Sequence, residues 1–145
     1  MERITQLITD LTEYDAIAEG IRGGKTPVEV TGLSPIHKAN LAAALAGQLH
    51  RQAVIICADD LACDRMARDL EAFSDRPAVV LPSREFVFHN IESSSREYEH
   101  RRISVLRDLA AGKKTVIVSV PALLMATMPP DSMQKATFPV NFSGE

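Results

Sequence analysis

Three short runs of the sequence are almost entirely apolar, and they limit the folds open to this chain more than any other feature. The runs are residues 53–58, 78–81 and 115–120. Strands covered on both faces have this character, whereas strands with one solvated face alternate apolar and polar residues. The segments between the runs have apolar residues at helical spacing. We therefore predict an α/β fold, a parallel sheet with helices on both faces.

Local signals place the remaining elements around these runs. Residues 28–31 predict a short strand, which leads into a helix over 34–49 with Ser34 as the N-cap and Pro35 at its first position. Further helices are expected over 59–73, 95–111 and 122–128, and residues 83–95 are expected to form an irregular connection. Before residue 26 we expect one or two amphipathic helices, ended by Gly20, Gly23 and Gly24.

The pattern predicts three parts along the chain. Residues 1–26 form a helical segment that packs on the core, residues 27–128 form the α/β domain, and residues 129–145 form a linker or the start of a following domain. Pro129-Pro130 predicts a stop. Residues 137–142 have the composition of a further strand, with nothing after them in the chain to pair with it.

Composition excludes several classes of protein. Among 145 residues, 46% are hydrophobic and 24% are charged, which is typical of a globular domain rather than a disordered chain. A formal net charge of −3 argues against a dedicated nucleic-acid module. No apolar run approaches the roughly 20 residues that cross a bilayer. With two cysteines and no signal peptide, we expect a cytoplasmic protein with reduced thiols.

Residues 32–39 fall on the frame of the phosphate-binding P-loop, G-x-x-x-x-G-K-[ST]. Gly32 and Lys38 match the frame, but His37 replaces the second glycine and Ala39 replaces the hydroxyl residue. The second glycine lets the backbone approach the phosphates, and the hydroxyl holds Mg²⁺. Alanine has no group that can hold a metal. We therefore predict a degenerate P-loop, a nucleotide-binding fold that binds no cofactor.

A P-loop ATPase also needs an acidic residue at the end of a strand to hold Mg²⁺. The run at 115–120 ends in Ser119-Val120-Pro121, with no carboxylate. Asp59 and Asp60 follow the first apolar run, and we favour helix capping as their role. We expect no catalytic residue and no metal site.

Two further features leave alternatives open. Cys57 and Cys63 are six residues apart, which is neither a redox nor a zinc spacing. We expect Cys57 to be a small buried side chain; a lowered pKa of Cys63 at the helix start is the alternative. In the helix at 95–111 we expect a solvated charged face and an inward face of Ile103, Leu106 and Ala110. A contact of Arg101-Arg102 with phosphates or a partner carboxylate is the alternative there.

Several of these segments together resemble a known family. They are 82–92 (Pro-Ser-Arg-Glu-Phe-Val-Phe-His-Asn-Ile-Glu), 101–106 (Arg-Arg-Ile-Ser-Val-Leu), Leu109, Gly112, 116–123 (Val-Ile-Val-Ser-Val-Pro-Ala-Leu) and Pro129-Pro130, with 30–33 (Val-Thr-Gly-Leu) and 69–70 (Asp-Leu). In order and spacing they are similar to the N-terminal region of the bacterial transcription-repair coupling factors (Mfd). The same region, about 28 to 130, resembles the first domain (1A) of the excision-repair helicase UvrB.

The resemblance implies a UvrB-like module without ATPase activity, in a parent protein whose ATP-driven DNA translocase lies in a distant C-terminal motor. It implies that this module recruits UvrA, mainly through an inserted domain that follows the first α/β domain. RNA polymerase and DNA would be met only through the parent protein, and no membrane is involved.

Three hypotheses follow. The first is a non-catalytic scaffold that supports UvrA recruitment. The second is a nucleotide-binding fragment of a UvrB-like helicase, completed by a partner domain, in which Lys38 binds phosphate and Asp60 binds metal. The third is an α/β domain that binds another small anion at the helix start between Ser34 and Lys38.

Overall fold

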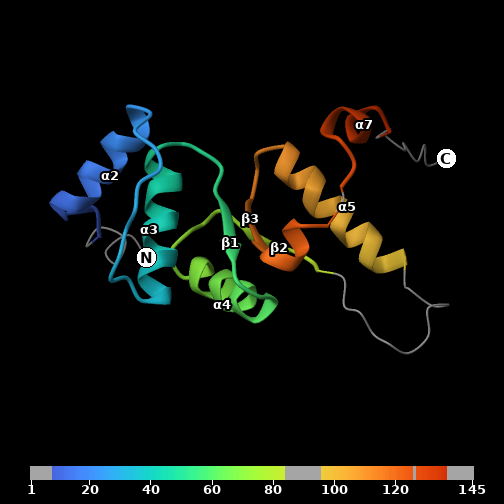
Figure 1. Ribbon diagram of the computed structural model, residues 1–145, viewed down its shortest axis with the longest axis horizontal. Helices are drawn as coiled ribbons and strands as arrows, with labels where there is room; N and C mark the ends of the chain where they lie inside the picture. Colours follow the sequence, from blue (N-terminus) through green and yellow to red (C-terminus); the bar gives the residue numbers. More distant parts are fainter. Residues whose placement is uncertain (1–7, 84–95, 126, 137–145) are drawn as a thin grey trace, which may run out of the picture.

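A computed structural model describes residues 8–83, 96–125 and 127–136. Three strands and six helices of these residues are arranged as in Figure 1. In chain order they are α2 (Thr12–Arg22), α3 (Pro35–Gln48), β1 (Val54–Cys57), α4 (Asp60–Glu71), β2 (Ala78–Leu81), α5 (Arg96–Ala110), β3 (Thr115–Ser119), α6 (Val120–Leu123) and α7 (Pro130–Lys135).

The three apolar runs form the sheet, as predicted. The strands are parallel and stand in the order β1-β3-β2, so that β3 is central. Ile117 of β3 lies between Ile55 of β1 and Val80 of β2 in the register. All five residues of β3 are buried, because a central strand with helices on both faces leaves no side chain to solvent.

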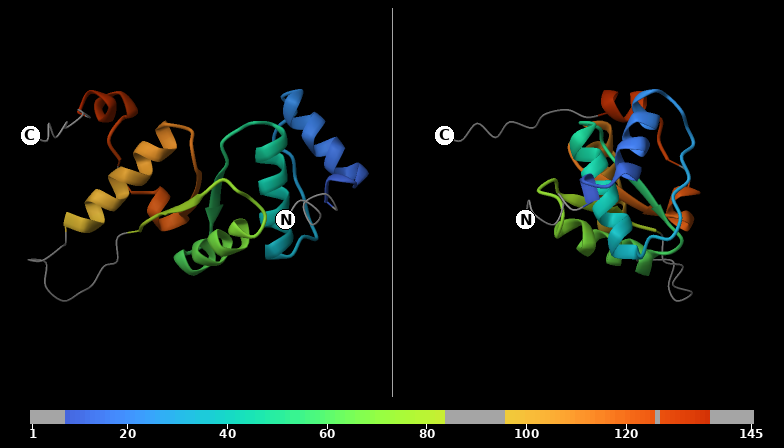
Figure 2. Two further views of the ribbon diagram at one scale, coloured as in Figure 1. Left: turned by 180° about the vertical axis from the view of Figure 1, so that it is seen from behind. Right: turned by 90° about the vertical axis from the view of Figure 1, so that its left-hand side faces the viewer.

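Helices cover both faces of the sheet, which confirms the α/β prediction. Val116 and Val118 of β3 belong to a core cluster with Leu81, Val105 of α5 and Ala122 of α6. Ile117 points to the other face, because side chains alternate along a strand. There it packs with three buried residues of α3 and α4, namely Ala39, Cys63 and Leu70. Figures 1 and 2 show α5 on one side of the strands and α3 on the other.

One strip of the sheet remains open. α5 packs against β2 and β3, and on the β1 side of the same face Val54 and Ile56 are 51% and 57% exposed. These residues pair in register with Val116 and Val118, which are buried. Among the described residues, then, no helix covers β1 on the face where α5 covers β2 and β3. The expectation that the apolar run at 53–58 is covered on both faces is therefore wrong for β1.

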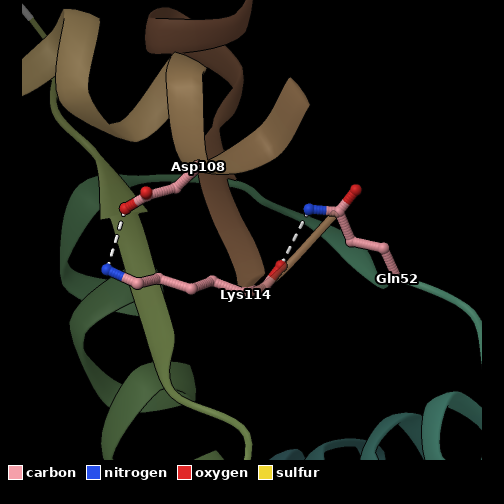
Figure 3. A network of polar contacts seen from close by, with 3 residues as sticks. All are labelled: Gln52, Asp108 and Lys114. Atoms are coloured by element: carbon pink, nitrogen blue, oxygen red, sulfur yellow. Dashed lines mark hydrogen bonds and ion pairs between the residues drawn. The ribbon is translucent and has the colours of Figure 1, made fainter. Parts of the chain in front are cut away.

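A polar network joins the segments that enter β1 and β3 (Figure 3). Gln52 Nε2 donates a hydrogen bond to the carbonyl oxygen of Lys114 at 2.9 Å, and Lys114 Nζ lies 2.8 Å from Asp108 Oδ2. The hydrogen bond and the positive charge of Lys114 lower the pKa of Asp108 below its ordinary value. Two strand entries and the end of α5 are thereby held together.

The strand predicted at residues 28–31 is wrong. These residues are neither helix nor strand, and Val28 and Val30 are 40% and 38% exposed. Pro27 has no N–H to donate, and the described sheet ends at β1 and β2, so no described strand supplies hydrogen bonds to this segment. Two valines that alternate with polar residues are too short a pattern to form a strand when no neighbouring strand lies beside them.

Helix boundaries differ from the predictions in three places. α2 passes through Gly20 and ends at its C-cap Gly23, after which Gly24 has a φ of +70° that favours glycine. α6 ends at Leu123, earlier than expected. Pro129-Pro130 was expected to be only a stop, but Pro130 is the first residue of α7, a position that tolerates proline because its N–H is not used. The possible strand at 137–142 and residues 84–95 of the connection lie outside the described residues.

The inward face of α5 also differs from the prediction. Ile103 is 53% exposed and Ala110 is exposed. Val105 is buried in the core, with Leu106 and Leu109 packed against that cluster, and Arg102 is buried as well. The buried stripe of α5, residues 102, 105, 106 and 109, keeps helical spacing but begins with an arginine, so a search for apolar residues at helical spacing misses its first position.

None of the described helices is long and apolar enough to cross a lipid bilayer.

Candidate functional site

The segment that resembles a P-loop does not follow a strand of the described sheet. Gly32 has a φ of +79°, and a Cβ added there would meet no atom within 4 Å. The backbone conformation therefore favours glycine here, without any close approach of another group. In a working P-loop the phosphate-binding turn follows a strand of the sheet. Here the residues before Gly32 are exposed and unpaired in the described sheet.

Ser34 and Pro35 start α3, as the sequence predicts. The Ser34 hydroxyl makes no capping hydrogen bond to the helix backbone. It lies 3.0 Å from Nδ1 of His37, the residue at the second glycine position. The Ser34–His37 pair lies in the first turn of α3. In a P-loop, the backbone N–H groups of the corresponding turn are exposed and bind phosphate.

Lys38 and Ala39 point in different directions from the same turn. Lys38 is exposed, and no carboxylate among the described residues forms an ion pair with it. Ala39 is completely buried, in contact with the core cluster of Cys63, Leu70 and Ile117. The position that carries the metal-binding hydroxyl in a P-loop is used in this chain for packing between helix and sheet.

The carboxyl ends of the strands are occupied by structural contacts. Asp59 Oδ1 accepts a hydrogen bond of 2.7 Å from the backbone N–H of Ala62, so the predicted capping role is confirmed. Asp60 accepts a hydrogen bond from the hydroxyl of Ser83, which follows β2. At the end of β3 the buried Ser119 Oγ accepts from the N–H of Ala122 at 3.3 Å and caps α6. No three His, Cys, Asp or Glu side chains of the described segments are arranged to hold a metal ion.

A buried arginine joins three segments at this end of the sheet. Arg102 Nη1 donates to the carbonyl oxygen of Pro82 at 3.0 Å, and its Nη2 donates to the carbonyl oxygen of Ala122 at 3.1 Å. The hydroxyl of Tyr98 donates to the same Pro82 oxygen at 3.1 Å. Arg102 therefore binds backbone carbonyls, in place of the phosphate or partner carboxylate weighed for Arg101-Arg102, while Arg101 is exposed.

The two cysteines, which are six residues apart in sequence, are neighbours in space. Cys57 ends β1 and Cys63 lies in the first turns of α4, and both pack in the cluster around Ile117. Cys63 is completely buried, but Cys57 is partly exposed, so the expectation of a buried Cys57 is wrong. Burial raises the pKa of Cys63 to about 12, and the neighbouring Cys57 adds to this rise. The alternative of a lowered pKa at the helix start is therefore wrong, because desolvation of a thiolate outweighs the helix dipole here.

These contacts define what the arrangement can do. The start of α3 lacks the glycine-rich turn and the hydroxyl with which a P-loop wraps a nucleoside triphosphate and its metal. No protein-family model, curated protein or solved structure matches this chain.

Proposed function

We propose that this chain is a non-catalytic, UvrB-like α/β scaffold domain of a bacterial transcription-repair coupling factor, and that it supports the recruitment of UvrA in nucleotide excision repair. The observation that carries the non-catalytic part is the burial of Ala39. Its side chain is 0% exposed and packs on Ile117 and Cys63. A site that needs a metal at this position would have to remove a residue from the core.

The family resemblance supports the rest of the proposal. Three of the segments that carry it meet at one point, because Arg102 hydrogen-bonds to Pro82 and to Ala122. The segments that resemble the family thus include residues that hold the sheet to α5 and α6. Such residues stabilise the fold and take no part in catalysis, as expected of a scaffold domain.

In this proposal the domain acts through the parent protein in the cytoplasm. The main UvrA-contacting surface lies in the domain that follows, and this α/β domain holds that surface in place. RNA polymerase and DNA are engaged by other parts of the parent protein, and the ATP-dependent translocase is also elsewhere.

The non-catalytic part predicts that Mg-ATP does not bind this chain. A ligand that binds only the folded protein raises its stability by RT ln(1 + [L]/Kd), about 2.7 kcal/mol at a hundredfold excess over Kd. We expect no shift of the thermal unfolding midpoint in an Mg-ATP titration into the millimolar range. The control is the same titration with inorganic phosphate, which separates weak anion binding at the start of α3 from nucleotide binding.

A saturable shift with Mg-ATP alone would contradict the proposal and favour the helicase alternative. In that alternative Lys38 and Asp60 are the residues that bind phosphate and metal, and both are exposed. Loss of the shift in Lys38→Ala and Asp60→Asn would then identify them. A shift with phosphate but without ATP would favour the third hypothesis, an anion site.

A further inference from the structure

We propose that the outer edge of β1 is an interface at which two copies of this chain pair, strand against strand, as a symmetric dimer. A second copy is the partner because this edge is complementary to itself in hydrogen bonding, in apolar surface and in charge. The described geometry of β1 carries the proposal, which does not depend on the proposed function.

The outer edge of β1 has backbone groups without a strand beside them. The N–H of Val116 donates to the carbonyl oxygen of Ala53 at 3.1 Å, and the register pairs Val54 with Val116. In a parallel ladder with this pattern, the N–H and carbonyl groups of Ala53 and Ile55 face β3. Those of Val54 and Ile56 therefore point away from β3, and no described strand pairs with them.

The same two residues expose their side chains, and together they form the open strip. Val54 and Ile56 are 51% and 57% exposed, on the face where α5 packs against β2 and β3. Charged residues, proline or a bulge commonly protect an edge strand from pairing. β1 (Val-Ile-Ile-Cys) has none of these, whereas β2 at the other edge runs into Pro82, which has no N–H to donate. β1 is therefore the edge open to a further strand.

Antiparallel pairing of β1 with its copy satisfies both the free backbone groups and the open strip. A two-fold axis beside Ile55 places Val54 opposite Ile56 of the second copy, and each such pair exchanges both of its N–H···O bonds. The apolar side chains of each pair then lie side by side on one face of the sheet.

Charge complementarity favours the same register. Asp59 keeps an extended backbone after β1, so this register brings Arg51 opposite Asp59 of the second copy, once on each side of the two-fold axis. Both side chains are exposed, and neither forms an ion pair with another described residue. Opposite charges at facing positions stabilise a strand pair.

The pairing closes as a dimer and is weak. A two-fold axis uses the β1 edge of both copies, so no longer assembly forms through this edge. β1 has four residues, which is short beside the interfaces of about 1,200–2,000 Å² that stable complexes bury. We therefore expect a dissociation constant between about 10 and about 100 µM.

Amide hydrogen exchange on the unsubstituted chain tests the interface directly. In dilute solution we expect the outward N–H groups of Val54 and Ile56 to exchange rapidly, and that of Ile55 to be protected by the ladder with β3. At about 1 mM, where most of the chain is paired, the N–H groups of Val54 and Ile56 should exchange at least about fivefold more slowly, and that of Ile55 should be unchanged. Sedimentation velocity on the same samples should show a shift from monomer to dimer.

Three variants locate the contact. Ile56→Lys places a charge on the edge, and we expect it to abolish the sedimentation shift and the added protection. The matched control is Ile103→Lys, because Ile103 is 53% exposed but lies on α5, outside the open strip; it should leave both unchanged. Arg51→Glu puts a like charge opposite Asp59 and should weaken the dimer about fivefold.

Two outcomes would overturn the proposal. One is a chain that stays monomeric, with Val54 and Ile56 exchanging equally fast at both concentrations. The other is a dimer that forms without added protection at these two residues, or that Ile103→Lys weakens as much as Ile56→Lys does. The exchange measurement on the unsubstituted chain decides the question even where Ile56→Lys fails to fold.

Discussion

Arg102→Met is expected to lower the free energy of unfolding by about 2–4 kcal/mol. The substitution keeps an apolar stem but removes both hydrogen bonds from the guanidinium, to Pro82 O and to Ala122 O. Each carbonyl keeps a second donor, the hydroxyl of Tyr98 on Pro82 O and the N–H of Met125 on Ala122 O, so the cost is the loss of the two guanidinium bonds themselves. Hydrogen bonds that involve a charged group contribute about 1.5–3 kcal/mol each, and part of this loss is offset because methionine, unlike the guanidinium, buries no charge. Urea unfolding measures the change as a shift of the midpoint.

The neighbouring arginine is a matched control. Arg101 is exposed, and Arg101→Met is expected to change the unfolding free energy by less than about 0.5 kcal/mol. Arg102→Lys should fall between the two, because one ammonium group cannot reproduce the planar fork that reaches two carbonyls. Equal, small effects of Arg101→Met and Arg102→Met would contradict the structural role of Arg102.

Ala39→Thr is expected to destabilise the chain by about 1–3 kcal/mol. The change restores the hydroxyl of the P-loop frame, but Ala39 is fully buried against Cys63 and Ile117. Extra atoms in a packed core force side chains off their preferred rotamers at this cost. Combined with His37→Gly, it should still create no ATPase, because Asp59 caps α4 and β3 ends without a carboxylate. Thermal and urea unfolding measure the loss, and a phosphate-release assay measures the activity.

A second alanine of α3 controls for the intrinsic helix preference of threonine. Ala42 is half-buried and lies outside both core clusters. Ala42→Thr carries the same change in helix propensity, at most about 0.7 kcal/mol. If Ala39→Thr lowers the free energy of unfolding no more than Ala42→Thr does, Ala39 is not tightly packed in the core. The burial of Ala39 would then no longer argue against a metal-binding hydroxyl at that position.

The strands of the sheet could be predicted from sequence because a run of consecutive apolar residues is a strong and local signal. Each apolar run became a strand, and the complete burial of β3 explains why its sequence lacks alternation. The start of α3 at Pro35 and the cap at Asp59 were also predictable, since both depend on neighbouring residues alone.

The remaining features depend on contacts between distant segments. Residues 28–31 have the composition of a strand, but strand formation also needs a paired neighbour, which the described sheet does not place beside them. From sequence alone, Arg102 is expected to be a solvated surface residue. Its burial follows from the fold, which brings the carbonyl oxygens of Pro82 and Ala122 to its guanidinium. The spacing of Cys57 and Cys63 matches no known motif, and only the fold places both residues in the core cluster around Ile117.

Within the candidate site, the sequence identified the two departures from the P-loop frame but not their consequences. His37 turned out to pair with Ser34 in the first turn of α3. Ala39 turned out to be a core residue, and the helical pattern did not distinguish it from the other alanines of α3. Burial of one alanine among several is decided by how α3 lies against α4 and the sheet, which sequence periodicity does not specify.

UvrA binding by the parent protein tests the scaffold proposal most directly. Purified UvrA is titrated calorimetrically into a polypeptide of the proposed parent protein that contains this chain and the domain proposed to follow it, and into the same polypeptide without residues 1–145. We expect saturable binding, weakened at least about tenfold, or 1.4 kcal/mol, by the deletion. Arg102→Met should weaken binding to the extent that it unfolds the domain, and Arg101→Met should leave it unchanged. Absence of UvrA binding, or equal affinity with and without residues 1–145, would contradict the account.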